Sequence, residues 1–208
     1  MYFEPGGIYH IYNQGNNRQK IFYNYENYKF FLWKIRDHIL PFADILAWCL
    51  MPNHFHLMIE VRDGGGSGSE GFTPSEALTI RATGQSCAAT SLNYSIGVML
   101  RSYTRAINIQ ENRTGSLFRK KTKAICLNEI KGISSHWYTS FGVTFLKVDI
   151  PEYQYTQVCF NYIHANPVKA GLADRAEDWE FSSYIDLIGM RGGSLVNRQR
   201  VEELGLIV

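Results

Sequence analysis

The chain has 208 residues, of which 45% are hydrophobic, so it fits one packed domain, with or without an appendage, and not a disordered chain. Its formal net charge of +2 is too small to indicate a partner by itself. Four of the 21 Lys and Arg residues do cluster in RKKTK at 119–123, although such a run is most often a solvated face. The cysteines are far apart without CxxC spacing, which favours free thiols over disulfides or a zinc site: Cys49, Cys87, Cys126 and Cys159.

The sequence shows no sign of a membrane segment. Its N-terminus, MYFEPGGIYHIYNQG, lacks a charged region followed by a long apolar one, and no apolar run approaches the roughly 20 residues that span a bilayer. We therefore expect a cytoplasmic protein without a membrane partner.

The first 61 residues contain strand and helix patterns in alternation. GGIYHIYN at 6–13 follows a glycine pair and is rich in aromatic and β-branched residues, which predicts a strand. NYENYKFFLWKIRDHI at 24–39 has apolar residues at helical spacing, with Asn24 as the expected N-cap. ADILAWCLM and HFHLMIEV then predict two strands joined by a turn at Pro52-Asn53, hence an antiparallel hairpin.

The middle of the chain begins with a change in composition. RDGGGSGSEGFTPSE at 62–76 is rich in Gly and Ser and predicts a loop or linker. A helical pattern resumes around 88–109, and LFRKKTKAICL at 117–127 contains an expected fourth strand.

The last third is mainly helical in pattern, apart from 132–150, for which no assignment follows from the pattern. EYQYTQVCFNYIHANP predicts a helix that ends near Asn166-Pro167. Residues 179–189 and the terminal RQRVEELGLIV predict two short helices. Segregated strands joined by hairpins and helices favour an α+β sandwich with antiparallel pairing over a doubly wound parallel sheet.

The stretch CLMPNHFHLMIE at 49–60 carries the first candidate site. Because side chains alternate along a strand, Phe55 and Leu57 point to one face, whereas His54 and His56 share the other. Two neutral imidazoles on one strand could converge on a metal ion. Alternatively, each histidine is hydrogen-bonded to the backbone on a half-covered sheet face, and the pattern alone leaves both interpretations open.

MPNHFHLMIE resembles the HUH motif of single-tyrosine (Y1) transposases. Four further segments resemble, in order, blocks of the REP-associated (RAYT-like) branch of that family: YHIYNQGNNRQKIF at 9–22, GSLFRKKTKAI at 115–125, NYIHANPVKAGL at 161–172 and WEFSSY at 179–184. The resemblance predicts a transposase-like domain over 1–190 with insertions near 63–90 and 128–150, followed by a helical extension over 191–208.

The resemblance implies a ferredoxin-like sandwich, with an antiparallel sheet and helices on one face. It also implies a divalent metal ion, Mg²⁺ or Mn²⁺, bound by His54 and His56, with a catalytic tyrosine on a late helix. Family members cut single-stranded DNA, often beside a hairpin, through a 5′-phosphotyrosine intermediate, and then rejoin strands in DNA transposition. Relatives include dimers that share helices between subunits and also single-chain forms, so the resemblance leaves both a homodimer and a monomer open. DNA binding would bring the protein to the nucleoid.

The family match selects Tyr162 as the nucleophile among 13 tyrosines. It also assigns Asn166, one helical turn later, to the metal shell, although an Asn before Pro is equally well explained as the N-cap of a short helix through Lys169. His164, two residues from Tyr162, points elsewhere on a helix and is left out of the site. Expected DNA contacts are the family-matched loop Asn16, Asn17 and Arg18 and the basic cluster Arg119, Lys120, Lys121 and Lys123.

Two other functions compete with a nicking and joining enzyme. A domesticated relative would bind single-stranded DNA or RNA hairpins without cleaving them. A metal-dependent phosphodiesterase would use water as its nucleophile, so that Tyr162 would be dispensable.

Overall fold

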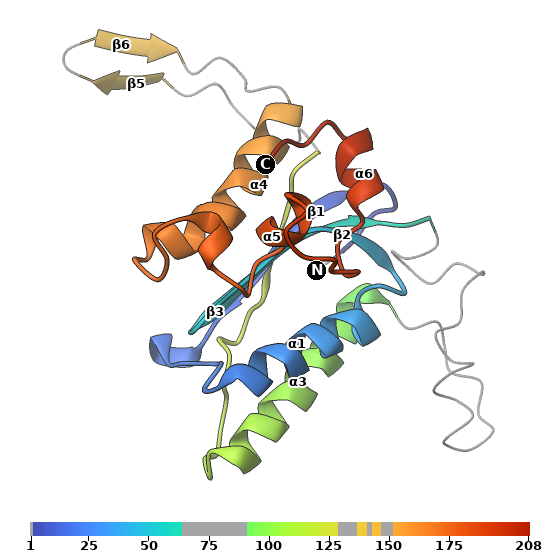
Figure 1. Cartoon of the computed structure of the whole chain (residues 1–208), viewed down its shortest axis with the longest axis vertical. Coiled ribbons are helices and arrows are strands. Elements are labelled where there is room, and N and C mark those ends of the chain that lie inside the picture. Colours follow the sequence, from blue (N-terminus) through green and yellow to red (C-terminus); the bar gives the residue numbers. More distant parts are fainter. Residues whose placement is uncertain (1, 64–90, 129–136, 141–142, 147–151) are drawn as a thin grey trace.

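A four-stranded antiparallel sheet forms the centre of the protein (Figure 1). The structure is a computed structural model that describes residues 2–63, 91–128, 137–140, 143–146 and 152–208. The sheet has the order β2-β3-β1-β4, and its strands span Ile8–Gln14 (β1), Ala43–Met51 (β2), His54–Val61 (β3) and Lys123–Cys126 (β4). With a helix after β1 and another after β3, this order gives the ferredoxin-like α+β arrangement that was predicted.

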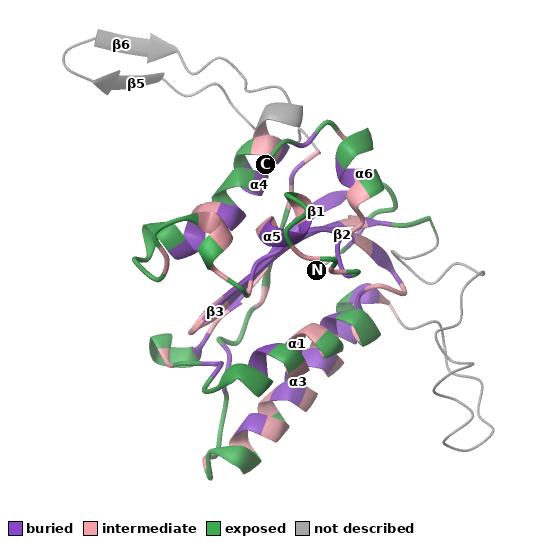
Figure 2. Ribbon diagram, viewed as in Figure 1, coloured by how far each residue is buried: buried purple, intermediate pink, exposed green. Residues whose placement is uncertain are grey.

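The two crossover helices pack side by side on one face of the sheet. Helix α1 (Tyr25–His38) begins at Asn24, whose side chain accepts from the Asn27 backbone N–H in a capping box, as the sequence predicted for this N-cap. Helix α3 (Leu92–Gln110) is capped by Ser91. Both helices turn their apolar faces toward the sheet, where Phe31, Phe55 and Tyr103 are fully buried. Figure 2 shows the resulting band of buried residues between the helices and the strands.

The opposite face of the sheet is covered by the C-terminal third of the chain. Helix α4 (Glu152–Lys169) packs mainly on β2, and three short helices follow it: η3 (Ala176–Asp178), α5 (Tyr184–Leu187) and α6 (Arg198–Glu203). The expectation of helices on one face therefore holds for α1 and α3, whereas α4 adds a layer on the second face (Figure 1).

Helix α4 continues past the point where the sequence predicted its end. Pro167 lies inside the helix, so the predicted end near Asn166-Pro167 is wrong by a few residues, and Asn166 does not cap a new helix. The helix tolerates Pro167 because only one backbone donor is lost so close to its end. It ends at Lys169, and Gly171 follows two residues later with a φ of 66° that suits glycine, while Leu172 N donates to Pro167 O at 2.9 Å.

The segment after α4 extends the outer edge of β2. Leu50 N donates to Phe181 O at 2.9 Å, and Ser183 N donates to Trp48 O at 2.9 Å. Two short helices were predicted for this region and the C-terminus, and α5 and α6 confirm them. These contacts cover strand edge that would otherwise expose unpaired backbone groups.

The predicted insertions near 63–90 and 128–150 lie largely outside the described residues, as does Cys87. Within the second one, strands β5 (Trp137–Ser140) and β6 (Val143–Leu146) pair with each other in an antiparallel ladder. Residues 191–208 pack on the domain itself, since Arg200 bonds to the Glu60 carboxylate. The part of the chain that the structure describes contains no helix long and apolar enough to cross a membrane.

Candidate functional site

The two histidines of β3 lie on the sheet face that α4 covers in part, as strand alternation predicted. In the antiparallel register, His56 lies opposite Tyr12 of β1, and His54 lies opposite Gln14. The intervening Phe55 points to the other face, where its ring packs against Phe31 at a centroid distance of 5.1 Å. The run thus has a core face, to which Phe55 belongs, and a separate histidine face.

Each histidine is oriented by a hydrogen bond to one ring nitrogen. His54 Nδ1 lies 2.6 Å from Asn53 Oδ1, and an amide oxygen only accepts, so Nδ1 donates and Nε2 keeps its lone pair. His56 Nδ1 lies 2.9 Å from His10 Nε2. His56 Nε2 is buried and has no hydrogen-bond partner among the described residues. A buried polar atom without a partner requires an explanation, and a bound ligand is one.

Burial keeps these histidines neutral. It lowers the pKa of His56 to about 2, and the adjacent His10 and His54 rings add to the effect. Burial also lowers the pKa of His10 to about 4 and that of His54 below its ordinary value. Neutral imidazole is the form that binds a metal ion.

Helix α4 brings Tyr162 to the histidine pair from about a hundred residues away in the sequence. The Tyr162 ring meets His56 edge-on at a centroid distance of 5.5 Å and His10 at 6.2 Å. Tyr162 is 40% exposed, so a partner from solution can reach this residue. The Lys169 ammonium, from the last turn of α4, lies 5.4 Å from the centre of the same ring.

These groups surround one cavity of about 360 Å³, here called the tyrosine pocket. It is lined by residues from β1, β3, α4 and the basic segment: Tyr12, Asn13, Gln14, His54, His56, Arg119, Lys121, Lys123 and Tyr162. The pocket thus combines two imidazoles, two phenols and three cations. Such a set of side chains suits an anionic substrate.

The predicted DNA-binding residues fall at different places around this pocket. Arg119, Lys121 and Lys123 line it, but Lys120 does not. The exposed loop Asn16–Arg18 lies beside the Pro52-Asn53 turn, where the Asn53 side chain donates to Arg18 O at 3.3 Å. This loop is therefore next to His54 along the sheet edge, although its residues do not line the pocket.

Two other polar side chains of α4 have separate surroundings. Asn166 is buried, does not line the tyrosine pocket, and donates from Nδ2 to Tyr162 O at 2.8 Å. Its role as a metal ligand remains a prediction. His164 points away from the histidine pair, as expected from its offset, with its Nε2 at 2.8 Å from Ser183 Oγ.

Sequence reasoning missed two aromatic members of this site, His10 and Tyr12. Their rings stack at a centroid distance of 4.8 Å, and His10 also stacks on His56 at 5.1 Å. Alternation along the first strand places His10 and Tyr12 on one face. Only the pairing of β1 with β3 places that face beside the histidines, and pairing register is not local information.

The histidine pair fits a divalent ion as part of a coordination shell. If the His56 proton is on Nδ1, the Nε2 atoms of both His54 and His56 have a lone pair free to bind a metal ion. The centroids of the two rings lie 5.0 Å apart, with an interplanar angle of 88°. Over the described ranges, no cluster of three or more His, Cys, Asp or Glu side chains could hold a metal. Further ligands would have to be amide, phosphate or water oxygens, which Mg²⁺ and Mn²⁺ accept.

The sequence matches no protein-family model and no curated protein. A solved structure, that of a REP-associated tyrosine transposase bound to a REP hairpin, is similar to this chain with a TM-score of 0.55. The two share 16% sequence identity, and the similarity covers 95% of this chain and 92% of the other. At this identity the likeness establishes a shared fold, which is the fold that the five sequence blocks implied.

Proposed function

We propose that this protein is a transposase-like DNA endonuclease and strand transferase in which Tyr162 is the nucleophile. The observation that carries the proposal is the tyrosine pocket itself. The Tyr162 and His56 ring centroids lie 5.5 Å apart, and three cations of the 119–123 segment line the same cavity. A structural core would not require two phenols, two imidazoles and three cations around one open cavity.

Tyr162 supplies the attacking oxygen. Its hydroxyl forms a bond to the scissile phosphorus while the bond from phosphorus to the 3′-oxygen breaks. The phenolic proton is lost, the departing oxygen takes up a proton, and the DNA 5′-phosphate stays on the tyrosine. Reversal of this step by a 3′-hydroxyl rejoins strands without ATP, because the phosphotyrosine keeps the energy of the original phosphodiester bond.

The surrounding side chains position the substrate for this attack. Arg119, Lys121 and Lys123 bind backbone phosphates, which gives affinity but no sequence preference. His54 and His56 would hold a divalent ion through their Nε2 atoms, and we include Asn166 Oδ1 as a third protein ligand. Such an ion, when bound, neutralises charge on the phosphate oxygens and orients the phosphate.

The proposed substrate is single-stranded DNA next to a hairpin. The structurally similar transposase is bound to a hairpin. We propose that the loop Asn16–Arg18, which lies beside the Pro52-Asn53 turn, contacts the foot of such a hairpin.

A covalent adduct is the direct test. The protein is incubated with Mn²⁺ and hairpin DNA that carries a single-stranded flank and a label at its 3′ end, since the fragment with the new 5′-phosphate stays attached. We expect a labelled protein band that Tyr162→Phe abolishes. Tyr12→Phe is the matched control, because it removes a hydroxyl from the same pocket and should leave the adduct in place.

The same assay separates the two rival functions. Cleavage that persists in Tyr162→Phe without an adduct would indicate a phosphodiesterase that uses water. Tight hairpin binding by the wild-type protein, with neither adduct nor cleavage, would indicate a non-cleaving nucleic-acid-binding protein.

A further inference from the structure

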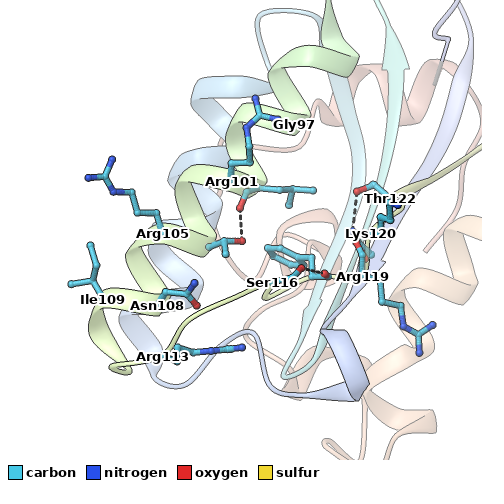
Figure 3. Close-up of a pocket in the computed structure, with 14 residues that line it drawn as sticks. Gly97, Arg101, Arg105, Asn108, Ile109, Arg113, Ser116, Arg119, Lys120 and Thr122 are labelled. Atoms are coloured by element: carbon cyan, nitrogen blue, oxygen red, sulfur yellow. Dashed lines mark hydrogen bonds between the residues drawn. The ribbon is translucent and has the colours of Figure 1, made fainter.

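A second, larger cavity lies between α3 and the segment that leads into β4. Its volume is about 620 Å³, and we call it the α3 groove. Figure 3 shows its two walls, one formed by α3 with Arg101 and Arg105 and the other by the segment with Ser116, Arg119 and Lys120. Its described lining includes no histidine and no tyrosine, so it is distinct from the tyrosine pocket.

The α3 groove is strongly basic. Among the residues that the structure describes, five cations and no carboxylate line it: Arg101, Arg105, Arg113, Arg119 and Lys120. Within the described parts of the chain, none of the five forms a salt bridge. On a protein with a net charge of only +2, this is a local concentration of positive charge without internal compensation, which favours a polyanionic ligand.

The arginines of α3 are arranged along the groove. Arg101 and Arg105 are one helical turn apart on the same face, about 6 Å along the axis at 1.5 Å per residue, and both are exposed. One turn earlier, Gly97 leaves room for the Arg101 guanidinium, since a Cβ at Gly97 would lie 3.1 Å from Arg101 Nη1. A row of separated cations suits successive phosphates better than a single compact anion.

The opposite wall is held in place by polar contacts. Asn13 Nδ2 donates to Arg119 O at 3.2 Å and to Thr122 Oγ1 at 2.9 Å, and Asn108 Nδ2 donates to Gly115 O at 2.9 Å. Arg113 is fixed by Gln19 Oε1 at 2.8 Å. The groove is therefore preorganised, with less ordering of the chain left for binding.

The basic segment 119–123 connects the groove to the tyrosine pocket. Arg119 lines both cavities, Lys120 lines only the α3 groove, and Lys121 and Lys123 line only the tyrosine pocket. A nucleic acid bound in one cavity would thus meet the other at Arg119.

The two cavities differ in the number of aromatic residues that line them, which indicates that they bind different parts of one ligand. Unpaired bases bind by stacking on exposed aromatic rings, and the tyrosine pocket offers Tyr12 and Tyr162. In the described part of the chain, the single aromatic residue lining the α3 groove is Phe118, which is only 5% exposed. The groove is thus equipped for a phosphate backbone whose bases are paired with each other.

We propose that the α3 groove binds the phosphate backbone of a base-paired DNA stem, while the unpaired strand beside the stem passes Arg119 into the tyrosine pocket. This inference rests on the proposed function, because it takes DNA as the ligand.

Binding of three DNA probes tests whether the stem binds in the α3 groove and the unpaired strand in the tyrosine pocket. The probes are a hairpin with a single-stranded flank, the same hairpin without the flank, and the flank alone. Any stem sequence serves, because backbone contacts are independent of sequence. The variant is Arg101→Glu with Arg105→Glu, and the control is Lys29→Glu with Arg36→Glu, which makes the same charge change at exposed positions of α1.

We expect the α3 variant to bind both hairpin probes more weakly, whereas its affinity for the flank alone stays within about twofold of wild type. The slope of log K against log salt for the hairpins should become shallower by about 2, at roughly 0.9 for each lost phosphate contact. The α1 control should behave as the wild type does with all three probes.

Unchanged hairpin binding by the α3 variant would overturn the inference, and so would an equal loss for the flank alone. Either result can occur while the wild-type protein still forms the Tyr162 adduct, so it would leave the proposed function intact. Failure of the proposed function would instead appear as the absence of that adduct in the wild-type protein.

Discussion

His10 Nε2 lies 2.9 Å from His56 Nδ1, and the two buried rings stack at a centroid distance of 5.1 Å. Only one of the two nitrogens carries the shared hydrogen. When His56 Nδ1 carries the hydrogen, His56 Nε2, which has no partner among the described residues, keeps a free lone pair for a metal ion. When His10 Nε2 carries the hydrogen instead, the proton of His56 is on its Nε2, which then cannot bind a metal ion. His10 therefore controls the tautomer of a proposed ligand.

This relationship predicts that His10→Phe weakens Mn²⁺ binding about 10- to 100-fold, the usual cost of removing a hydrogen-bond partner of a metal ligand. Phenylalanine retains the stacked ring but has no acceptor. His10→Gln, whose amide oxygen can accept from His56 Nδ1, should recover most of the affinity. Titration calorimetry with Mn²⁺ measures both variants, and equal affinity in His10→Phe and wild type would show that His10 is only a packing residue.

Variants of Asn166 test whether its side-chain amide is a metal ligand or has only a structural role. Its Nδ2 donates to Tyr162 O, which leaves Oδ1 for the ion in our proposal. We expect Asn166→Ala to lower Mn²⁺ affinity and Asn166→Asp to raise it, because a carboxylate is the stronger ligand for a hard cation. If both variants bind Mn²⁺ as the wild type does and only the melting temperature changes, Asn166 serves the helix alone.

The stability of the metal-free protein should fall as the solution becomes mildly acidic. Burial lowers the pKa of His164 from 6.5 to about 4, so between these values the unfolded state binds the proton and the folded state does not. The contribution is present above pH 6.5 and is lost as the pH falls, by about 1 kcal/mol for this group between pH 7 and 5.5. Urea unfolding in EDTA at both pH values measures this change.

His164→Gln is the matched variant for that experiment. It removes the titrating group, while its amide can still bond to Ser183. We expect its loss of stability between pH 7 and 5.5 to be smaller than that of the wild-type protein by about 1 kcal/mol. An identical loss would assign the acid sensitivity to other groups.

Gly15 is required by close packing where β1 leads into the loop Asn16–Arg18. A Cβ at this position would lie 2.1 Å from Gln19 O, a backbone atom that cannot move without displacing the loop. We expect Gly15→Ala to destabilise the protein by about 1–3 kcal/mol, the range for overpacking. Gly192→Ala is the control, because a Cβ there meets no atom of the described residues within 4 Å. Equal midpoints for the two variants in thermal unfolding would refute the steric argument.

Local patterns in the sequence predicted most of the fold. The apolar periodicity of α1 and α3, the cap at Asn24 and the hairpin turn at Pro52-Asn53 all depend on residues within one or two turns of each other, and all are observed. Helix α4 was misjudged because Pro167 is a strong local stop signal that a helix near its end can nevertheless accommodate.

The histidine face of β3 was also predictable, because side-chain alternation is a property of the extended backbone. The partners of that face were not. His10 reaches His56 through the register of β1 against β3, and Tyr162 reaches them through the packing of α4 across the sheet. Register and packing depend on contacts between residues far apart in the chain.

The basic cluster likewise shows one property that follows from the sequence and another that depends on tertiary packing. The sequence by itself determined that Arg119, Lys120, Lys121 and Lys123 are concentrated before a strand, and hence that this segment carries positive charge. Only the tertiary structure decided that Lys121 and Lys123 belong to the tyrosine pocket while Lys120 belongs to the α3 groove with Arg101 and Arg105. Charge is a property of residue type, but the cavity that a charge serves depends on which distant elements pack beside it.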